Sequence, residues 1–463
     1  MELQLRISGF HYEILERHLL PADGREAVAV ALCGRFHDSE SEYLLIYDLT
    51  LIPHDQCISR EPDLLHWSTE RIQHYFEKIS KNDFALLKIH SHPGGHEKFS
   101  RTDNISDHEF FDSAFGWSMS DKPHASAVML PDGKIFGRFF FNDLHHEPID
   151  KISIAGDTVK QFTGSINIGY SDFALRTIQA FGELTYQSLS KMTVGVVGCS
   201  GTGSPVIEQL VRLGIRKLVL IDPDIVERKN LNRILNTTNE DAEKEKPKVL
   251  AIADAIIKIG LSTIVDSRQV NLYDDVDALK ALIKCDVIFG CMDSVDGRHL
   301  LNQLSSFYLL PYFDLGVKLE ADGLGGINKI CGSVHYLQPG KSSLITRGVY
   351  TTEDLRASSQ YRKNPKEFES LRKNAYIKNV NVNNPAVISV NMQVASHAVN
   401  EFLNRIHPFK TEQPSSYAVS TIDITEGCIV NSDESDFKED LYLKKETGRG
   451  DMVPFIEMSE LIV

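Results

Sequence analysis

The stretch that decides the fold is TVGVVGCSGTGSP, residues 193–205. Residues 193–197 are dominated by valine, as is typical of a strand that is buried on both faces. The glycine-rich turn at 198–204 follows directly, and Pro205 stands where the first turn of a helix tolerates proline. A strand, a glycine-rich turn and a helix in succession predict the first unit of a parallel, doubly wound sheet.

The same alternation continues along the chain. Apolar runs predict strands at 217–221 and 287–289, and the spacing of apolar residues predicts helices at 205–213, 249–259 and 386–403. Strands that alternate with helices imply βαβ units, so this region is expected to be α/β with a Rossmann-like sheet.

The N-terminal region has a different pattern, with several strands and little helix between them. Strands are expected at 26–33, 43–52, 84–89, 125–130 and 134–141, and a helix at 64–81. This pattern predicts an α+β domain at 1–150. The polar residues that follow suggest a linker at 151–168, before an α/β domain at 169–430 and an acidic tail at 431–463.

Composition excludes some classes of partner. The chain has 463 residues, with 49 Lys plus Arg against 64 Asp plus Glu and a formal charge of -15, so no basic face for nucleic acid or an anionic membrane is expected. No apolar run approaches the roughly 20 residues of a membrane span. The seven cysteines are scattered, which favours a reducing cytoplasm over a disulfide scaffold.

The densest chemistry in the N-terminal region is HSHP at residues 90–93, followed by Ser100 and Asp103. Two histidines spaced two apart at a strand end project from one face, and a nearby carboxylate makes a third ligand. Three protein ligands leave a fourth tetrahedral position open for water, as in a catalytic zinc site. His-x-His alone is more often a pair of surface histidines than a metal site.

The complete string, His-x-His-Pro, six residues, Ser, two residues and Asp, resembles the motif of the JAMM (JAB/MPN) metallopeptidases. These zinc isopeptidases cleave ubiquitin-like tails and carry a catalytic Glu at the start of an earlier strand that leads into a Gly. The resemblance implies His90, His92 and Asp103 as Zn²⁺ ligands, Glu26 as the general base and Ser100 as an oxyanion donor. His96 and His124 are each expected to be a loop or core residue and not a metal ligand.

The glycine-rich loop is a candidate nucleotide site. Its backbone N–H groups and the start of the following helix can bind phosphates, and Asp222 ends the next strand where a ribose hydroxyl is often bound. Ser200 stands where the dinucleotide fingerprint has its middle glycine. From these residues alone, NAD binding, ATP binding and a plain tight turn all remain open.

Four later motifs distinguish these readings: DPDIVE at 222–227, NLNR at 230–233, KPK at 246–248 and CMDS at 291–294. Together they are similar to the ThiF/MoeB superfamily of ubiquitin-activating-type adenylyltransferases, over about residues 181–403. That chemistry joins a C-terminal carboxylate to the α-phosphate of ATP. The resemblance implies Gly198, Gly201 and Gly203 as the phosphate cradle, Asp222 at the ribose, Asn230, Arg233 and Lys248 at the phosphates, and Asp293 at Mg²⁺.

Two further features follow from the same resemblance. Family members form homodimers and take an arginine from the opposite protomer, just before a Phe-Gly; Phe181-Gly182 is present and Arg176 is the nearest arginine. Relatives that form a thioester carry a cysteine in a later crossover segment, whereas this chain has none between Cys331 and Cys428. The neighbours of Cys428 are acidic, which disfavours a thiolate.

The sequence therefore predicts a bifunctional protein of a ubiquitin-like pathway, with a zinc peptidase and an adenylating domain. Its expected partners are a ubiquitin-like protein that ends in Gly and a conjugating-enzyme homologue. Two alternatives remain open. The chain could adenylate a peptide or a sulfur carrier, or it could use both folds as a non-catalytic scaffold.

Overall fold

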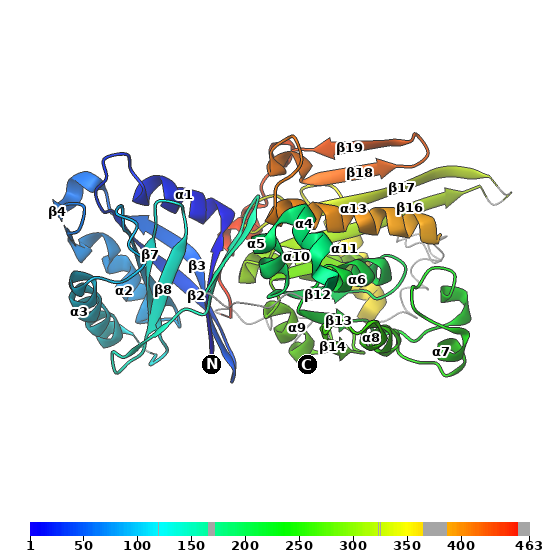
Figure 1. Cartoon of the computed structure of the whole chain (residues 1–463), viewed down its shortest axis with the longest axis horizontal. Coiled ribbons are helices and arrows are strands. Elements are labelled where there is room, and N and C mark those ends of the chain that lie inside the picture. Colours follow the sequence, from blue (N-terminus) through cyan, green and yellow to red (C-terminus); the bar gives the residue numbers. More distant parts are fainter. Residues whose placement is uncertain (119, 165–171, 323, 325, 364–386, 452–463) are drawn as a thin grey trace. The chain divides into compact units, whose positions relative to one another are not determined.

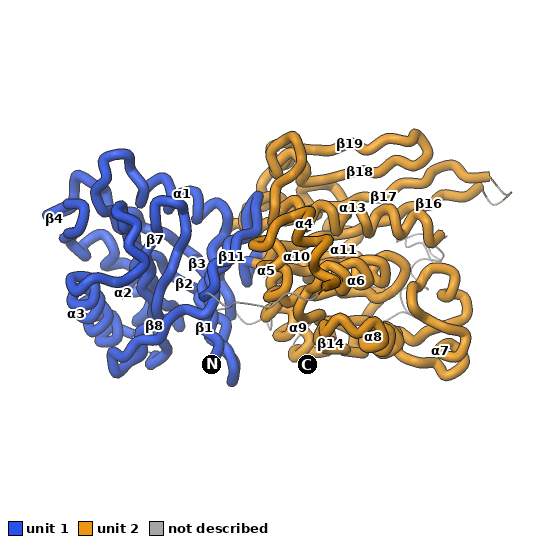
Figure 2. Tube along the Cα trace, viewed as in Figure 1, with its two compact units in different colours: residues 1–166, 306–309, 445–463 blue, residues 167–305, 310–444 orange. Residues whose placement is uncertain are grey.

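The computed structural model describes residues 1–118, 120–164, 172–322, 324, 326–363 and 387–451. The chain divides into two compact units (Figure 2). Unit 1 comprises residues 1–166, 306–309 and 445–463, and unit 2 comprises residues 167–305 and 310–444. Among the described residues, no helix is both long and apolar enough to cross a membrane.

Unit 1 contains a nine-stranded mixed sheet in the order β11-β10-β1-β3-β2-β6-β7-β8-β9 (Figure 1). Its strands are β1 (Glu2–Ser8), β2 (Val28–His37), β3 (Ser41–Leu51), β6 (Ala85–Ser91), β7 (His124–Met129), β8 (Ile135–Phe140), β9 (His146–Pro148), β10 (Lys151–Ala155) and β11 (Val159–Thr163). The helices are α1 (Gly9–Leu19), α2 (Gln73–Ile79) and α3 (Arg101–Trp117), and β4 (Cys57–Arg60) pairs with β5 (Leu65–Trp67).

A separate hydrophobic core lies on each face of this sheet. Alternate side chains of β2 belong to one core or the other. Ala29 and Ala31 pack in the cluster that contains Leu15 of α1. Val28, Val30 and Leu32 point the other way, into the cluster formed by α2 and α3. A strand buried on both faces explains why β2 reads as a continuous apolar run.

Unit 2 is built on an eight-stranded sheet in the order β14-β13-β12-β15-β16-β17-β18-β19. Its strands are β12 (Thr193–Val197), β13 (Lys217–Ile221), β14 (Ile264–Arg268), β15 (Val287–Gly290), β16 (Tyr312–Ala321), β17 (Ile327–Leu337), β18 (Val419–Asp423) and β19 (Cys428–Ser432). The five from β14 to β16 pair in parallel, as the βαβ pattern predicts, and the remaining pairings are antiparallel.

The helices of unit 2 connect and cover these strands. They are α4 (Leu175–Phe181), α5 (Glu183–Leu189), α6 (Gly203–Arg212), α7 (Asn239–Glu243), α8 (Lys248–Ile259), α9 (Val276–Ile283), α10 (Val295–Tyr308), α11 (Thr352–Lys363), α13 (Ile388–Ile406) and α14 (Leu441–Lys445). The last residues of α10 belong to unit 1. Helix α13 packs against α6, β16 and β17.

Three sequence predictions about elements need correction. The helix expected at 64–81 begins only at Gln73, because Leu65–Trp67 pairs with β4 and the Ser68 side chain caps a 3-10 turn. The linker expected at 151–168 contains β10 and β11, which extend the sheet of unit 1 beside β1. The helix expected at 386–403 runs from Ile388 to Ile406; Ala386 lies outside the described residues.

The acidic tail expected at 431–463 is structured as far as residue 451. Its first residues complete β19, and the segment from 445 belongs to unit 1. There the Asp451 N–H donates to the Arg35 carbonyl at 2.7 Å. Gly34 lies so close that a Cβ at this position would collide with the Gly448 carbonyl. A local pattern does not predict such a long-range contact, and residues 452–463 lie outside the described part.

Candidate functional sites

The strand pairing of unit 1 places two histidines beside a glutamate. His90 lies in β6, opposite Val28 of β2, and His92 follows the end of β6. The Ser91 N–H donates to the Ala27 carbonyl at 3.0 Å, which continues the antiparallel register beyond β2. One further step along this register places Glu26 opposite His92.

Helix α3 supplies the carboxylate through its N-terminal cap. Ser100 is the N-cap residue, and its Oγ accepts a hydrogen bond from the Asp103 N–H at 3.0 Å. In return, Asp103 Oδ2 accepts from the Ser100 N–H at 2.6 Å. This capping box fixes the direction of the Asp103 side chain. The Ser100 hydroxyl is used here as an acceptor, which leaves its proton available to another partner.

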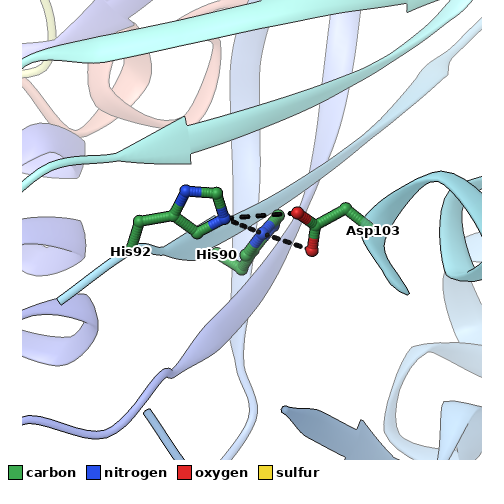
Figure 3. A group of neighbouring side chains, drawn as sticks. All are labelled: His90, His92 and Asp103. Carbon is green, nitrogen blue, oxygen red and sulfur yellow. Dashed lines mark hydrogen bonds and ion pairs between the residues drawn. The ribbon is translucent and has the colours of Figure 1, made fainter. Parts of the chain in front are cut away.

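The donor atoms of the three predicted ligands converge (Figure 3). His90 Nε2 lies 3.1 Å from Asp103 Oδ1, His92 Nε2 lies 3.3 Å from Asp103 Oδ2, and the two Nε2 atoms are 3.2 Å apart. Ligands bound to zinc at about 2.0–2.1 Å in a tetrahedron stand roughly 3.3 Å from one another. The side chains therefore fit a tetrahedral cation with one position left open.

The surroundings of the histidines orient them for this role. His92 Nδ1 lies 2.8 Å from the His96 carbonyl, which favours the tautomer with Nε2 free to bind a metal. Burial lowers the pKa of His90, whereas hydrogen bonds with Asp103 and the His96 carbonyl outweigh burial and raise the pKa of His92. Burial also opposes ionisation of Asp103, but its hydrogen bonds with both histidines hold the pKa of this carboxyl well below its usual range.

Glu26 is 7% exposed and lines a cavity of about 20 Å³ together with His90 and Asp103. Burial, followed by the negative charge of Asp103, raises the pKa of Glu26 to about 7. The cavity has room for about one water molecule. The expected core role of His124 is confirmed, because this buried histidine accepts a hydrogen bond from the Leu86 N–H at 2.9 Å.

A buried ion network lies behind the three ligands and was not predicted from the sequence. Asp107 of α3 is fully buried, with Lys88 Nζ 2.8 Å from one carboxylate oxygen and Arg138 Nη2 2.7 Å from the other. Arg138 also donates to Asn104 at 2.6 Å. The network ties α3, which carries Asp103, to strands β6 and β8. Its three charges come from distant positions, so no local spacing indicates it.

We expect Asp107→Asn to destabilise unit 1 by about 3–5 kcal/mol, because it leaves two buried cations without their counter-ion. The matched control is Asp112→Asn, an exposed aspartate on the same helix, which should change stability by less than about 0.5 kcal/mol. Both tryptophans of the chain, Trp67 and Trp117, belong to unit 1. Urea unfolding followed by tryptophan emission therefore measures this unit, and equal stability of the two variants would contradict the expectation.

In unit 2 the predicted nucleotide residues gather at the carboxyl ends of the parallel strands. The chain runs from β12 through β13 to β14 on one side, and β15 lies on the other side of β12. Crevices at such a topological switch point are where doubly wound sheets bind ligands. A pocket of about 810 Å³ opens here. It is lined by Gly198, Gly201, Asp222, Asn230, Arg233, Lys248 and Asp293, among others.

Close packing against the backbone requires glycine at positions 198 and 203 of the loop. Gly198 has a φ of +92°, and a Cβ there would collide with the Cys291 carbonyl. A Cβ on Gly203 would collide with the Gly198 carbonyl, and one on Gly201 with the Asn391 amide. The helix that follows, α6, has no side-chain cap at its start. Its uncapped N–H groups suit a phosphate.

The charged residues are held by the loops that follow the strands. Asp222 accepts hydrogen bonds from the Cys199 N–H at 2.7 Å and the Asp224 N–H at 2.9 Å, and burial raises its pKa. Lys248 begins α8, and its Nζ lies 2.6 Å from Asp224 and 3.9 Å from Asp222. The Asn230 amide oxygen accepts from the Glu227 N–H at 3.2 Å. Asp293 is exposed at the pocket surface.

The predicted Arg176 lies apart from this pocket, and so does Cys428, which was not expected to be a nucleophile. Arg176 is exposed on α4, with Nη1 2.9 Å from Gln179 of the same helix, and it does not line the pocket. Cys428 is exposed at the start of β19, opposite Asp423. By contrast, Asn391 of α13 and Arg362 of α11 line the pocket and were not predicted. Arg362 pairs with Asp296 at 2.8 Å. Both come from helices far along the chain, so only the fold brings them here.

Comparison with known proteins shows the family of the chain. Curated relatives include ubiquitin-like modifier-activating enzyme 5 of Caenorhabditis elegans, 29% identical over 180 residues (36% of this chain, 40% of the relative), and of Dictyostelium discoideum, 28% identical over 169 residues (34% and 42%). The chain thus spans less than half the length of these relatives.

Among solved structures, E. coli MccB with ATP is 18% identical with a TM-score of 0.43, over 61% of this chain and 75% of that chain. A model described as the ThiF family matches residues 174–428. Because this match covers more than half of the sequence, the chain belongs to the ThiF family.

Proposed function

We propose that unit 2 activates a C-terminal carboxylate by adenylation. A carboxylate oxygen attacks the α-phosphorus of ATP, the bond from that phosphorus to the bridging oxygen of the β-phosphate breaks, and pyrophosphate leaves with the electron pair. The pocket at the switch point is the observation that supports this proposal most strongly, because it brings the glycine loop, Lys248, Arg233 and Asp293 together.

Each pocket residue would have a role that follows from its charge. The loop N–H groups and the start of α6 would bind the phosphates, and Asp222 would accept hydrogen bonds from the ribose. Asn230, Arg233 and Lys248 would stabilise the negative charge that develops on the leaving pyrophosphate. Asp293 would hold Mg²⁺, which neutralises phosphate charge when it is bound. A homodimer would allow the exposed Arg176 to reach the pocket of a second chain.

The substrate class is a ubiquitin-like protein that ends in Gly. The names of the curated relatives support this class, although the chain matches less than half of their length. A peptide or a sulfur carrier is the second candidate, since the sequence has no cysteine between Cys331 and Cys428 to receive the acyl group. With either substrate, we expect no thioester on Cys428, so Cys428→Ser should leave the products unchanged on a non-reducing gel.

ATP–pyrophosphate exchange tests the adenylation proposal. Exchange should depend on a partner with a free C-terminal carboxylate and should stop when that carboxylate is blocked as an amide, because the amide lacks the attacking oxygen. Exchange that continues with the amide would exclude this carboxylate as the nucleophile.

We further propose that unit 1 is a zinc-dependent peptidase or isopeptidase that trims or removes such a tail. Three converging ligands with an open fourth position support this proposal. Zinc, when bound, would lower the pKa of its water and polarise the scissile carbonyl. Glu26 would take the water proton and pass it to the leaving amine, and the Ser100 hydroxyl would donate to the oxyanion.

Zinc content tests the metal site before any substrate is known. The purified chain should carry about one zinc ion, because the three donors match a tetrahedral site. His92→Ala should lose it, whereas the buried core variant His124→Gln should keep it, since His124 accepts from the Leu86 N–H and lies outside the ligand group. Equal zinc in both variants would contradict the assignment.

A further inference from the structure

A groove of about 710 Å³ crosses the surface of unit 1 between β5, α2 and α3. Four aromatic side chains line it: Trp67, Phe76, Phe110 and Trp117. The ring centroid of Phe76 lies 6.4 Å from that of Phe110 and 6.3 Å from that of Trp117. Trp117 is 59% exposed, so a large aromatic ring of the groove lining lies open to solvent.

The groove lies next to the candidate metal site. Leu65, Trp67, Lys88 and Ser106 line both this groove and the small cavity that contains Glu26, His90 and Asp103. A polypeptide that lies in the groove would therefore be bound beside the cavity that two of the ligands line. None of the ligands lines the groove itself, so the two parts can be tested separately.

The groove also carries uncompensated negative charge. Glu77 of α2 and Glu109 of α3 are exposed at its edges, and neither carboxylate has an ion pair within the described part of the chain. The one cation in the lining, Lys88, pairs with Asp107 at 2.8 Å and not with either glutamate, and Arg138 shares the same carboxylate. The aromatic rings also favour a positively charged ligand, because the faces of such rings attract cations.

We propose that this groove binds the segment of the substrate polypeptide that flanks the scissile bond, and that it selects a Lys or Arg side chain there. The aliphatic stem of such a side chain would pack on the aromatic rings while its charged end reaches Glu77 or Glu109. This inference rests on the proposed peptidase function, since it names part of the substrate of that same site.

Tryptophan emission offers a direct test, because the chain has two tryptophans and both line the groove. The full chain is titrated with two matched octapeptides, one with a central Arg and the other with citrulline, which has nearly the same shape without the charge. The Arg peptide should shift the emission in a saturable way and bind about tenfold more tightly at low salt.

Charge variants then locate the binding. Glu77→Gln and Glu109→Gln should each lower the affinity for the Arg peptide by about threefold to tenfold and leave the affinity for the citrulline peptide unchanged. Asp112→Asn, which removes an exposed charge from α3 outside the groove, should have little effect. Equal affinity for the two peptides, or an equal loss in all three variants, would overturn the proposed selectivity. Binding seen by anisotropy without an emission change would place the peptide elsewhere and also overturn it.

The same titration separates this inference from the peptidase proposal. If the chain binds the Arg peptide selectively but cleaves no substrate, the peptidase function is refuted and the proposed binding role of the groove stands. If the chain cleaves substrate with no preference for Arg over citrulline, the peptidase function stands and the proposed selectivity of the groove is refuted.

Discussion

Glu26→Gln is expected to reduce peptide cleavage by about 10²–10⁴-fold while zinc content stays at the wild-type level. The amide is nearly isosteric with the carboxylate but cannot take a proton from the attacking water. Glu26 does not belong to the converging ligand group, so its replacement should leave His90, His92 and Asp103 in place. Cleavage rate and metal content are measured on the same preparation.

Glu13→Gln is the matched control, since Glu13 is exposed on α1 and lines neither the cavity nor the groove. It should retain both zinc and activity. Full cleavage by the Glu26 variant would remove this residue from the mechanism. A joint loss of zinc and activity would instead give Glu26 a structural role.

Asp293→Ala is expected to lower ATP–pyrophosphate exchange by about a hundredfold or more, because Mg²⁺ support of the leaving phosphates is lost. Zinc content should not change, since Asp293 and the zinc ligands lie in different units. Asp277→Ala, at an exposed position of α9 outside the pocket, is the control and should exchange at the wild-type rate. Unimpaired exchange in the Asp293 variant would show that this carboxylate does not hold the metal.

Local patterns predicted the elements that carry the two candidate sites. Strands β12 and β13 occupy the predicted residues, 193–197 and 217–221, because short apolar runs bounded by turns leave few alternatives. The histidine pair and Asp103 were also predicted, and the structure brings their donor atoms together. Here a motif of fixed spacing coincides with a strand end and a helix cap, so local sequence determines much of the geometry.

What the sequence did not predict depends on contacts between distant segments. Strands β10 and β11 look polar and irregular because only part of each strand is buried, and their pairing with β1 decides their structure. The Lys88–Asp107–Arg138 network and the contribution of Asn391 to the pocket are of the same kind. The fold itself must be known before such residues can be assigned a place.

The products of ATP turnover with the carboxylate partner test the central claim, activation at the α-phosphate, most directly. ATP labelled at the α-phosphate is incubated with the full chain and the partner, and the labelled products are separated. The account predicts AMP joined to the partner carboxylate, with unlabelled pyrophosphate released in equal amount. Labelled ADP, with the γ-phosphate joined to the partner carboxylate or released from it by water as inorganic phosphate, would show attack at the γ-phosphate instead and would contradict the account.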